Sequence, residues 1–303
     1  MIKSKITKAG DWVFVLLCVL IIAICILPML NLLAQSLSSS QSIINRKVTF
    51  LPVYHDEKTN EFRLGAILDN YTYVFLDKSF SRSMYWTAIL TVICTVWSLL
   101  ITIFCAYPLT YPWLKGRGII NTLIIFTMYF SAGTIPNYIL MKNLNLLNNP
   151  LVLILPNCLS VFNMIILRSF FYSIPDSLRE SAEIDGANPF TVLAKIYLPL
   201  SLPVLATLAL FYAVGRWNGF SDALLYINAA PQYIPIQLKL YQLIQNISSI
   251  EVATVEMVSG AVPRASDAMK AAAVMFATVP ILLIYPWLQR YFIAGVTIGA
   301  VKG

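Results

Sequence analysis

Long apolar stretches, separated by shorter polar connections, occupy most of the chain. A helix that crosses the hydrocarbon core of a bilayer needs about 20 mainly apolar residues. We therefore predict an all-α polytopic membrane protein, in which residues 1–303 form a single transmembrane domain. The six predicted transmembrane helices are Trp12–Leu33, Met84–Pro112, Gly118–Met141, Leu151–Leu167, Leu198–Gly215 and Ala271–Leu288.

The first apolar stretch follows a basic N-terminus that contains Lys3, Lys5 and Lys8, as a secretory signal peptide would. Its apolar core is longer than the roughly 7–15 residues of such a peptide, although LLAQS at 32–36 weakly resembles a cleavage site. We expect a retained membrane span rather than a cleaved leader.

Composition supports a membrane protein and narrows its chemistry. Hydrophobic residues make up 58% of the chain and charged residues 12%, whereas about a quarter of a typical soluble domain is charged. The net charge of +7 does not indicate nucleic-acid binding, because the basic residues are scattered among apolar segments. The five cysteines lie in apolar runs without C-x-x-C spacing, so neither a metal site nor a disulfide framework is expected.

Basic residues in short loops predict the orientation in the membrane. The N-terminal tail is basic, Lys115 and Arg117 follow the second predicted helix, and further basic residues follow the last one. These groups share one side if both termini are cytoplasmic. We therefore expect residues 172–198 in the cytoplasm, and residues 35–83 and 216–267 on the extracellular side.

The predicted helices contain no Asp, Glu or His. Proton-coupled transporters use such groups as relays, so proton coupling is disfavoured, whereas sodium coupling through backbone carbonyls stays open. The chain also lacks the G-x-x-x-x-G-K-[ST] phosphate-binding motif. If the chain transports a solute, we expect another chain to supply the energy; a self-sufficient secondary transporter or channel is the alternative.

Uncharged polar and aromatic residues remain near membrane depth. An amide in hydrocarbon needs a hydrogen-bond partner, so these groups either join helices or line a path for a polar neutral solute. A sugar suits such a path, because amides bond its hydroxyl groups and aromatic rings cover its faces. The candidate substrate-path residues are Asn137, Tyr138, Phe162, Asn163, Tyr212, Arg216, Trp217 and Asn218.

The segment 172–198 is acidic and is interrupted by glycine and proline. Pro175 is suited to begin a helix, Gly186 to end it, and the Asn-Pro pair that ends in Pro189 to cap and begin a second helix. Glu180 and Glu183 lie three residues apart in the first helix and would repel each other. We therefore expect a helix–Gly–helix unit on the cytoplasmic face that meets a basic partner on another protein.

This segment resembles the EAA loop of ABC importer permeases, whose pattern is E-A-A-x3-G-x9-I-x-L-P. Glu180-Ser181-Ala182, Gly186 and Ile196-Tyr197-Leu198-Pro199 match it, with Ser181 in place of an alanine. LDNYTYVF at 68–75, GRWNGFSDALLYINAAPQYIPIQL and the C-terminal LQRYFIAGVTIGAVKG also resemble carbohydrate permeases, so the resemblance covers nearly the whole chain. It is greatest to the second permease subunit of oligosaccharide importers.

The resemblance implies the type I ABC importer permease fold and a non-enzymatic membrane subunit of a bacterial cell membrane. It implies as partners a homologous second permease, two ATP-binding-cassette ATPase subunits, an extracellular solute-binding protein and membrane lipid. ATP and Mg would be used by the ATPase subunits, and no cofactor would be bound by this chain. The implied ATPase-coupling residues are Glu180, Ser181, Ala182, Glu183, Asp185, Gly186, Ile196, Leu198, Pro199 and Lys302.

The solute is less constrained by the sequence than the architecture. The resemblance favours an oligosaccharide, and the same architecture for a non-sugar solute is the alternative. Arg216 and Arg264 would suit the carboxylates of an acidic sugar, or they are ordinary loop residues.

Overall fold

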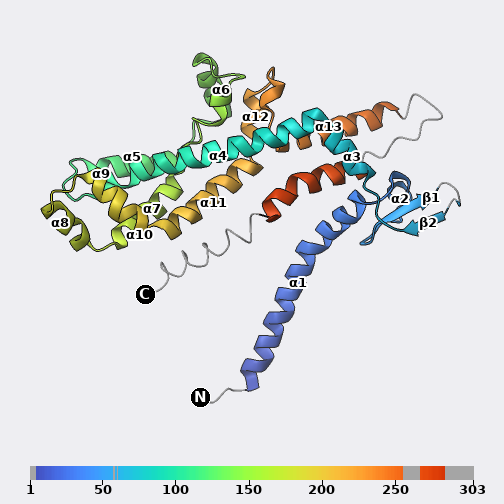
Figure 1. Cartoon of the computed structure of the whole chain (residues 1–303), viewed down its shortest axis with the longest axis horizontal. Helices are drawn as coiled ribbons and strands as arrows, with labels where there is room; N and C mark the ends of the chain where they lie inside the picture. Colours follow the sequence, from blue (N-terminus) through green and yellow to red (C-terminus); the bar gives the residue numbers. More distant parts are fainter. Residues whose placement is uncertain (1–4, 57–58, 60, 255–266, 284–303) are drawn as a thin grey trace. The chain divides into compact units, whose positions relative to one another are not determined.

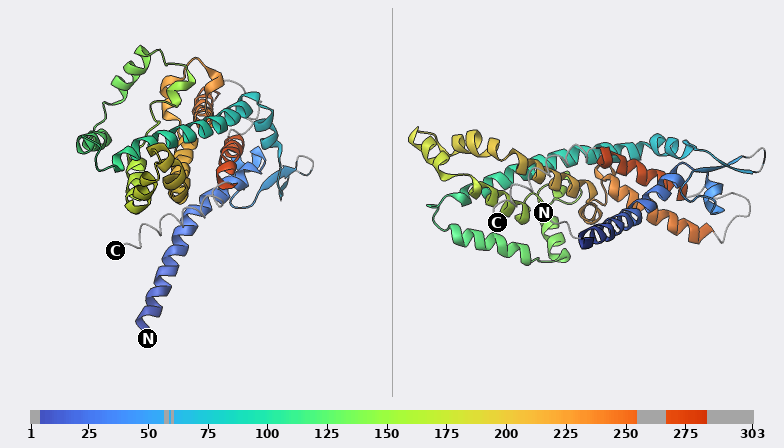
Figure 2. Two further views of the ribbon diagram at one scale, coloured as in Figure 1. Left: turned by 60° about the vertical axis from the view of Figure 1, so that its left-hand side comes forward. Right: turned by 90° about the horizontal axis from the view of Figure 1, so that it is seen from below.

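The structure is a computed structural model that describes residues 5–56, 59, 61–254 and 267–283. Its elements are shown in Figure 1, with two further views in Figure 2. They are α1 (Lys5–Ser36), α2 (Ser40–Ile44), β1 (Val53–Asp56), β2 (Glu61–Leu64), α3 (Asp69–Leu76), α4 (Lys78–Ala106), η1 (Pro108–Thr110), α5 (Arg117–Tyr129), α6 (Thr134–Asn143), η2 (Pro150–Leu153), α7 (Val161–Ser173), α8 (Asp176–Ile184), α9 (Pro189–Val192), η3 (Leu193–Tyr197), α10 (Leu198–Leu200), α11 (Leu202–Asn218), α12 (Ser221–Tyr226), η4 (Pro231–Tyr233) and α13 (Ile236–Thr254).

The chain divides into two compact units, which are described separately. The first contains residues up to Ser81 together with Leu240–Val279, and the second contains Arg82–Lys239 and the residues after Val279. Within the described residues, 267–283 are also helical. The predicted last transmembrane helix therefore begins at 267 rather than Ala271, and its end at Leu288 lies outside the described residues.

The first unit contains the longest helix and a small hairpin. The stretch Asp11–Ser36 of α1 is long and apolar enough to cross a membrane, as predicted. β1 and β2 pair antiparallel, with Val53 opposite Leu64. The expectation of an all-α protein is therefore corrected to a mostly helical one. The prediction rested on apolar stretches of membrane length, and strands of four residues are too short to be seen in that way.

The second predicted helix is continuous, since Lys78–Thr110 is long and apolar enough to cross a membrane. The third is not: α5 and α6 meet at an angle of 113°. Gly133 sits at the break with a φ of +89°, a positive value that glycine adopts readily because it has no Cβ. The prediction of one uninterrupted helix over 118–141 is therefore wrong, because hydropathy does not register such a turn.

The fourth and fifth predicted helices have different boundaries in the structure. Residues 154–160 separate η2 from α7, which begins only after Ser160, whose Oγ accepts a hydrogen bond from the Asn163 amide at 3.4 Å. Pro156 disfavours helical geometry in the residue before it. The fifth predicted helix, expected from Leu198, begins at Leu202 in the structure. The chain bends by 82° there, between Pro189–Leu200 and Leu202–Asn218.

Two described helices are thus long enough to cross a membrane alone, and there are up to four candidate spans if each bent pair counts as one.

The second unit is held together by two hydrophobic clusters. One joins the end of α4 to α7, the segment 189–200 and α11, through buried residues that include Tyr107, Leu167, Tyr197 and Leu208. The other joins the middle of α4 to η2, α12 and α13. As a result α4, α7 and α11 lie side by side within this unit (Figures 1 and 2).

Candidate coupling segment and substrate cavity

The first helix of the acidic segment ends in the hydrogen-bond pattern of a glycine cap. The amide of Ala187 donates to the carbonyl of Ala182 at 2.9 Å, and the amide of Gly186 donates to that of Glu183 at 3.0 Å. This pair of bonds is the Schellman motif, and the φ of +79° at Gly186 gives the left-handed residue that the motif requires. The predicted helix end at Gly186 is confirmed.

A Cβ added at Gly186 would meet no other atom within 4 Å, so the space beside this turn is open. The second helix begins as predicted, with Pro189 in its first turn. The Asn188 side chain accepts a hydrogen bond from the Thr191 amide at 2.8 Å. α8 differs slightly from the prediction, since it begins at Asp176 and Pro175 only precedes it.

A buried arginine that the sequence analysis did not single out fixes α8. The side chain of Arg179 is 4% exposed, and it pairs with Asp176 at 3.0 Å and with Glu183 at 3.8 Å. Its guanidinium also stacks over the rings of Tyr111, at 5.4 Å, and Trp113, at 5.1 Å. Glu183 therefore has a basic partner inside the chain, and the expected repulsion from Glu180 is relieved locally.

The sequence already places Arg179 three residues from one acid and four from the other, so both ion pairs could have been predicted.

Glu180 and Asp185 remain exposed on the same helix. Large apolar side chains of the same segment are exposed too: Ile184 is 86% exposed, and Phe190 of α9 is 72% exposed. Acids next to exposed apolar groups of this size are typical of a protein interaction surface.

The remaining residues of the motif differ in their exposure. Ala182, Ile196 and Leu198 are partly buried against the first cluster, whereas Pro199 is exposed. The largest buried side chain of the motif is Tyr197, which the sequence analysis quoted without giving it a role.

Ser181, at the position where the pattern has alanine, donates its hydroxyl back to the Ser177 carbonyl at 2.8 Å. Two residues of the sequence-based assignment, Lys302 and Arg264, lie outside the described residues.

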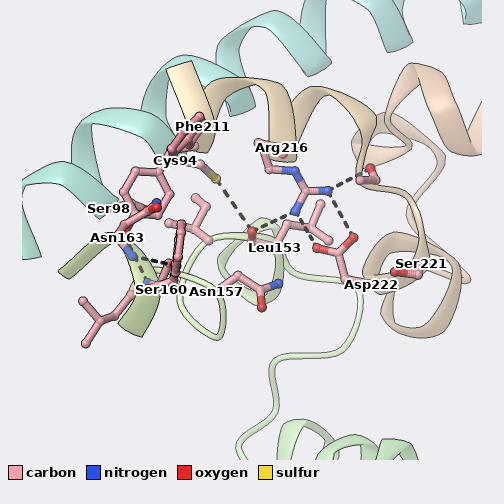
Figure 3. Close-up of a pocket in the computed structure, with 16 residues that line it drawn as sticks. Cys94, Ser98, Leu153, Asn157, Ser160, Asn163, Phe211, Arg216, Ser221 and Asp222 are labelled. Atoms are coloured by element: carbon pink, nitrogen blue, oxygen red, sulfur yellow. Dashed lines mark hydrogen bonds and ion pairs between the residues drawn. The ribbon is translucent and has the colours of Figure 1, made fainter. Parts of the chain in front are cut away.

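A cavity of about 710 Å³ opens among α4, η2, α7, α11 and α12. Four of the predicted substrate-path residues line it: Phe162, Asn163, Tyr212 and Arg216. Figure 3 shows polar groups from separate elements pointing towards the same space, among them Asn157, Ser98 and Ser221. Its volume lies within the roughly 300–1,000 Å³ of small-molecule sites.

Arg216 is not a free cation in this cavity. It donates from both terminal nitrogens to Asp222, at 2.5 and 3.1 Å, and also to the carbonyls of Leu153, at 3.2 Å, and Gly219, at 3.1 Å. Both charged side chains are largely buried. The thiol of Cys94 donates to the same Leu153 carbonyl at 3.7 Å (Figure 3). The pair therefore neutralises itself and clamps the end of α11 to η2 and to α12.

The Tyr212 hydroxyl connects three helices at the wall of the cavity. It accepts a hydrogen bond from the Ser160 amide at 3.1 Å and shares another with the Thr102 hydroxyl at 2.7 Å. α4, α7 and α11 meet through this one group.

The other predicted path residues lie elsewhere. Asn137 is exposed on α6, and Tyr138 stacks on Tyr226 at 6.1 Å. Trp217 is buried without lining the cavity, and Asn218 donates to the Val214 carbonyl at 3.0 Å. Position within an apolar stretch does not decide which face of a helix a residue occupies.

The cavity is also lined by residues that the sequence did not indicate: Asp222, Cys94, Ser98 and Ser221. In the part of the chain that the structure describes, no three His, Cys, Asp or Glu side chains form a metal-binding group.

Comparisons with known proteins place this chain among transport components. The profile of the family described as "Binding-protein-dependent transport system inner membrane component" matches residues 61–298. The chain therefore belongs to this family. It is a permease subunit of an ABC transport system and has no catalytic role of its own.

Curated relatives cover nearly the whole chain. Protein LplC of Bacillus subtilis (strain 168) is 42% identical over 281 residues, which span 93% of this chain and 90% of LplC. The polygalacturonan/rhamnogalacturonan transport system permease protein YtcP of the same organism is 39% identical over 280 residues, spanning 92% and 93%. The arabinooligosaccharides transport system permease protein AraQ of Halalkalibacterium halodurans is 29% identical over 309 residues, spanning 99% and 100%.

A solved structure confirms the fold class. A chain of a bacterial ABC transporter involved in the import of the acidic polysaccharide alginate is 29% identical, with a TM-score of 0.84 over 96% of this chain and 99% of that one. The chain has the type I ABC importer permease fold.

Proposed function

We propose that this chain translocates an oligosaccharide that an extracellular solute-binding protein delivers, and that ATP hydrolysis in separate ATPase subunits drives the transport. Two of the relatives named above, YtcP and AraQ, carry the names of polygalacturonan/rhamnogalacturonan and arabinooligosaccharide transport systems, and these names support a carbohydrate as the solute. ATP and Mg belong to the ATPase subunits, and this chain binds neither. A homologous second permease completes the membrane part.

We place six crossings in the membrane, with both termini in the cytoplasm and the chain in a bacterial cell membrane. α1, α4, the bent pair α5–α6, α7 with residues 150–160, α11 and the helix at 267–283 provide them. Residues 172–198 then form the cytoplasmic coupling loop, and residues 35–83 and 216–267 face the solute-binding protein. The two uninterrupted apolar helices and the two bent pairs account for up to four of these crossings.

The observation that carries the coupling role is the open turn at Gly186. Its left-handed backbone closes α8 with no side chain above it, and Ile184 is exposed next to Asp185. A groove on an ATPase accepts such a helix through its apolar side chains, while a basic group pairs with Glu180. Ile196 and Leu198 connect the docked unit to the membrane helices.

The cavity beside Asn163 and Tyr212 is the proposed contact with the sugar. Amide and hydroxyl groups bond sugar hydroxyls, and the rings of Phe162 and Phe211 cover sugar faces. Arg216 and Asp222 are the two ionic groups that line the cavity, and each compensates the charge of the other. In this arrangement the cavity binds the sugar through its neutral groups.

The test is affinity purification of the tagged chain from native membranes in mild detergent, read by mass spectrometry. Wild type is compared with Gly186→Arg and with the matched control Gly116→Arg. Gly116 also has a positive φ, of +81°, and open space at its Cβ. We expect an ATPase, a second permease and a solute-binding protein with wild type and the control, and loss of the ATPase with Gly186→Arg. A wild-type chain that purifies alone overturns the proposed assembly with these partners.

The solute is tested in the reconstituted transporter by its stimulation of ATP hydrolysis. Galacturonan and arabinan fragments are compared with amino acids and phosphate. Stimulation by a non-sugar solute alone would replace the carbohydrate with that solute and keep the architecture.

A further inference from the structure

A second cavity, of about 370 Å³, lies between the end of α4 and α9. Aromatic and apolar side chains form most of its wall, among them Phe104, Trp113 and Phe190. It is separate from the substrate cavity, with which it shares no lining residue. The proposed function above gives it no role.

The wall of this cavity is fixed by contacts within the chain. The Tyr107 hydroxyl donates to the Pro189 carbonyl at 2.9 Å, so the end of α4 is bonded to the start of α9. Arg179 stacks on Trp113 at 5.1 Å and holds the connecting segment against α8. The cavity is thus a built feature between two elements.

Lys115 is the one charged residue among those that line the cavity. Phe104, which is 53% exposed, lies inside the apolar helix that is long enough to cross a membrane. Lys115 lines the cavity too, beyond the end of that helix, and is exposed. None of the ion pairs among the described residues involves Lys115. Trp113, 61% exposed, lies between these two residues in the sequence, as tryptophan does at a membrane–water boundary.

We propose that this cavity binds an anionic phospholipid of the surrounding membrane. The acyl chain lies against Phe104 and Phe190, and the phosphate group meets the ammonium of Lys115. A single basic group in an otherwise mostly apolar and aromatic lining matches a lipid that has an anionic head and apolar tails. A free phosphate would contact only Lys115 and leave the aromatic wall unoccupied. An experiment can therefore distinguish a lipid headgroup from free phosphate.

The bound lipid links the bilayer to the coupling segment. Phe190 belongs to α9, and Trp113 touches Arg179 of α8, so both parts of the helix–Gly–helix unit border the site. The lipid would therefore stabilise the position of that unit relative to α4.

The first test measures lipid retention by the full chain in detergent, using native mass spectrometry. Phosphatidylglycerol is compared with phosphatidylcholine of the same acyl chains, each with and without inorganic phosphate. We expect preferential retention of phosphatidylglycerol, unaffected by phosphate, and a loss of about fivefold in this preference with Lys115→Gln. Lys142→Gln, another exposed lysine at a helix end, is the control and retains the preference.

Equal retention of the two lipids, competition by phosphate, or the same loss in both lysine variants overturns the proposal. The measurement needs neither sugar nor ATPase, so its outcome is independent of the proposed transport function.

The second test identifies the occupant in native membranes that contain the whole transporter. A photoreactive p-benzoylphenylalanine replaces Phe190, and the crosslinked products are identified by mass. A phospholipid adduct that decreases when Lys115→Gln is added supports the site. An adduct with an ATPase subunit or with the second permease means that a protein covers the groove, and the lipid is then rejected.

Discussion

Replacing Asp222 with alanine removes the counter-ion of a buried arginine. Arg216 donates two hydrogen bonds to Asp222 and one each to the carbonyls of Leu153 and Gly219. In Asp222→Ala only the two neutral carbonyl acceptors remain for a charge that stays largely shielded from water.

Breaking a buried ion pair from one side costs about 3–5 kcal/mol, because the remaining charge is uncompensated. At about 2–4 °C per kcal/mol for a unit of this size, the melting temperature would fall by about 6–20 °C.

The assay is thermal unfolding in detergent, followed by the loss of the monodisperse peak in size-exclusion chromatography. Glu61→Ala is the control, since Glu61 lies in an exposed pair that contributes about 1 kcal/mol or less. In the double variant Arg216→Met with Asp222→Leu, most of the lost stability returns, because an apolar pair of similar volume leaves no buried charge.

Two results would refute this reasoning. One is an Asp222→Ala variant that melts with the Glu61→Ala control. The other is a double variant whose loss equals the sum of the losses in Arg216→Met alone and Asp222→Leu alone, because additivity means that the two side chains do not interact.

Three further outcomes are expected. Arg179→Ala removes two cation–π stacks of about 0.5–2 kcal/mol each, so the amides of α8 should exchange hydrogen faster; protection equal to wild type contradicts this. Tyr212→Phe leaves the Ser160 amide without its acceptor and should cost about 1–3 kcal/mol and reduce uptake; unchanged melting and uptake would make the hydroxyl dispensable. Asn188→Ala should cost about 1 kcal/mol at the cap of α9, and Asn188→Ser should restore it; equal losses would exclude capping.

The controls for these variants are available within the chain. Tyr129→Phe changes an exposed tyrosine and should leave melting and uptake unchanged. Ser177→Ala alters α8 without touching the Arg179 contacts, and it therefore reports the effect of any substitution in that helix.

The sequence predicted the features that depend on neighbouring residues. The turn at Gly186 and the cap at Asn188 were both readable, because a left-handed glycine and an Asn-Pro pair act on backbone groups a few residues away. α1 and α4 were readable for the same reason, as their length and apolar composition are continuous along the chain. The family resemblance of residues 180–199 agreed with the later comparison.

Only the tertiary structure decided which residues form the two cavities. Thr102 and Tyr212 are 110 positions apart, and the Arg216 contact to Leu153 spans 63 positions. Because these helices are apolar on nearly every face, their sequences give no periodic signal for which side meets a neighbour.

The breaks within the predicted helices also could not be predicted from the sequence pattern. The turn at Gly133 lies inside a stretch whose hydropathy is continuous. Hydropathy therefore determined that the chain enters a membrane, and long-range packing determined where its helices bend and which polar groups they bring together.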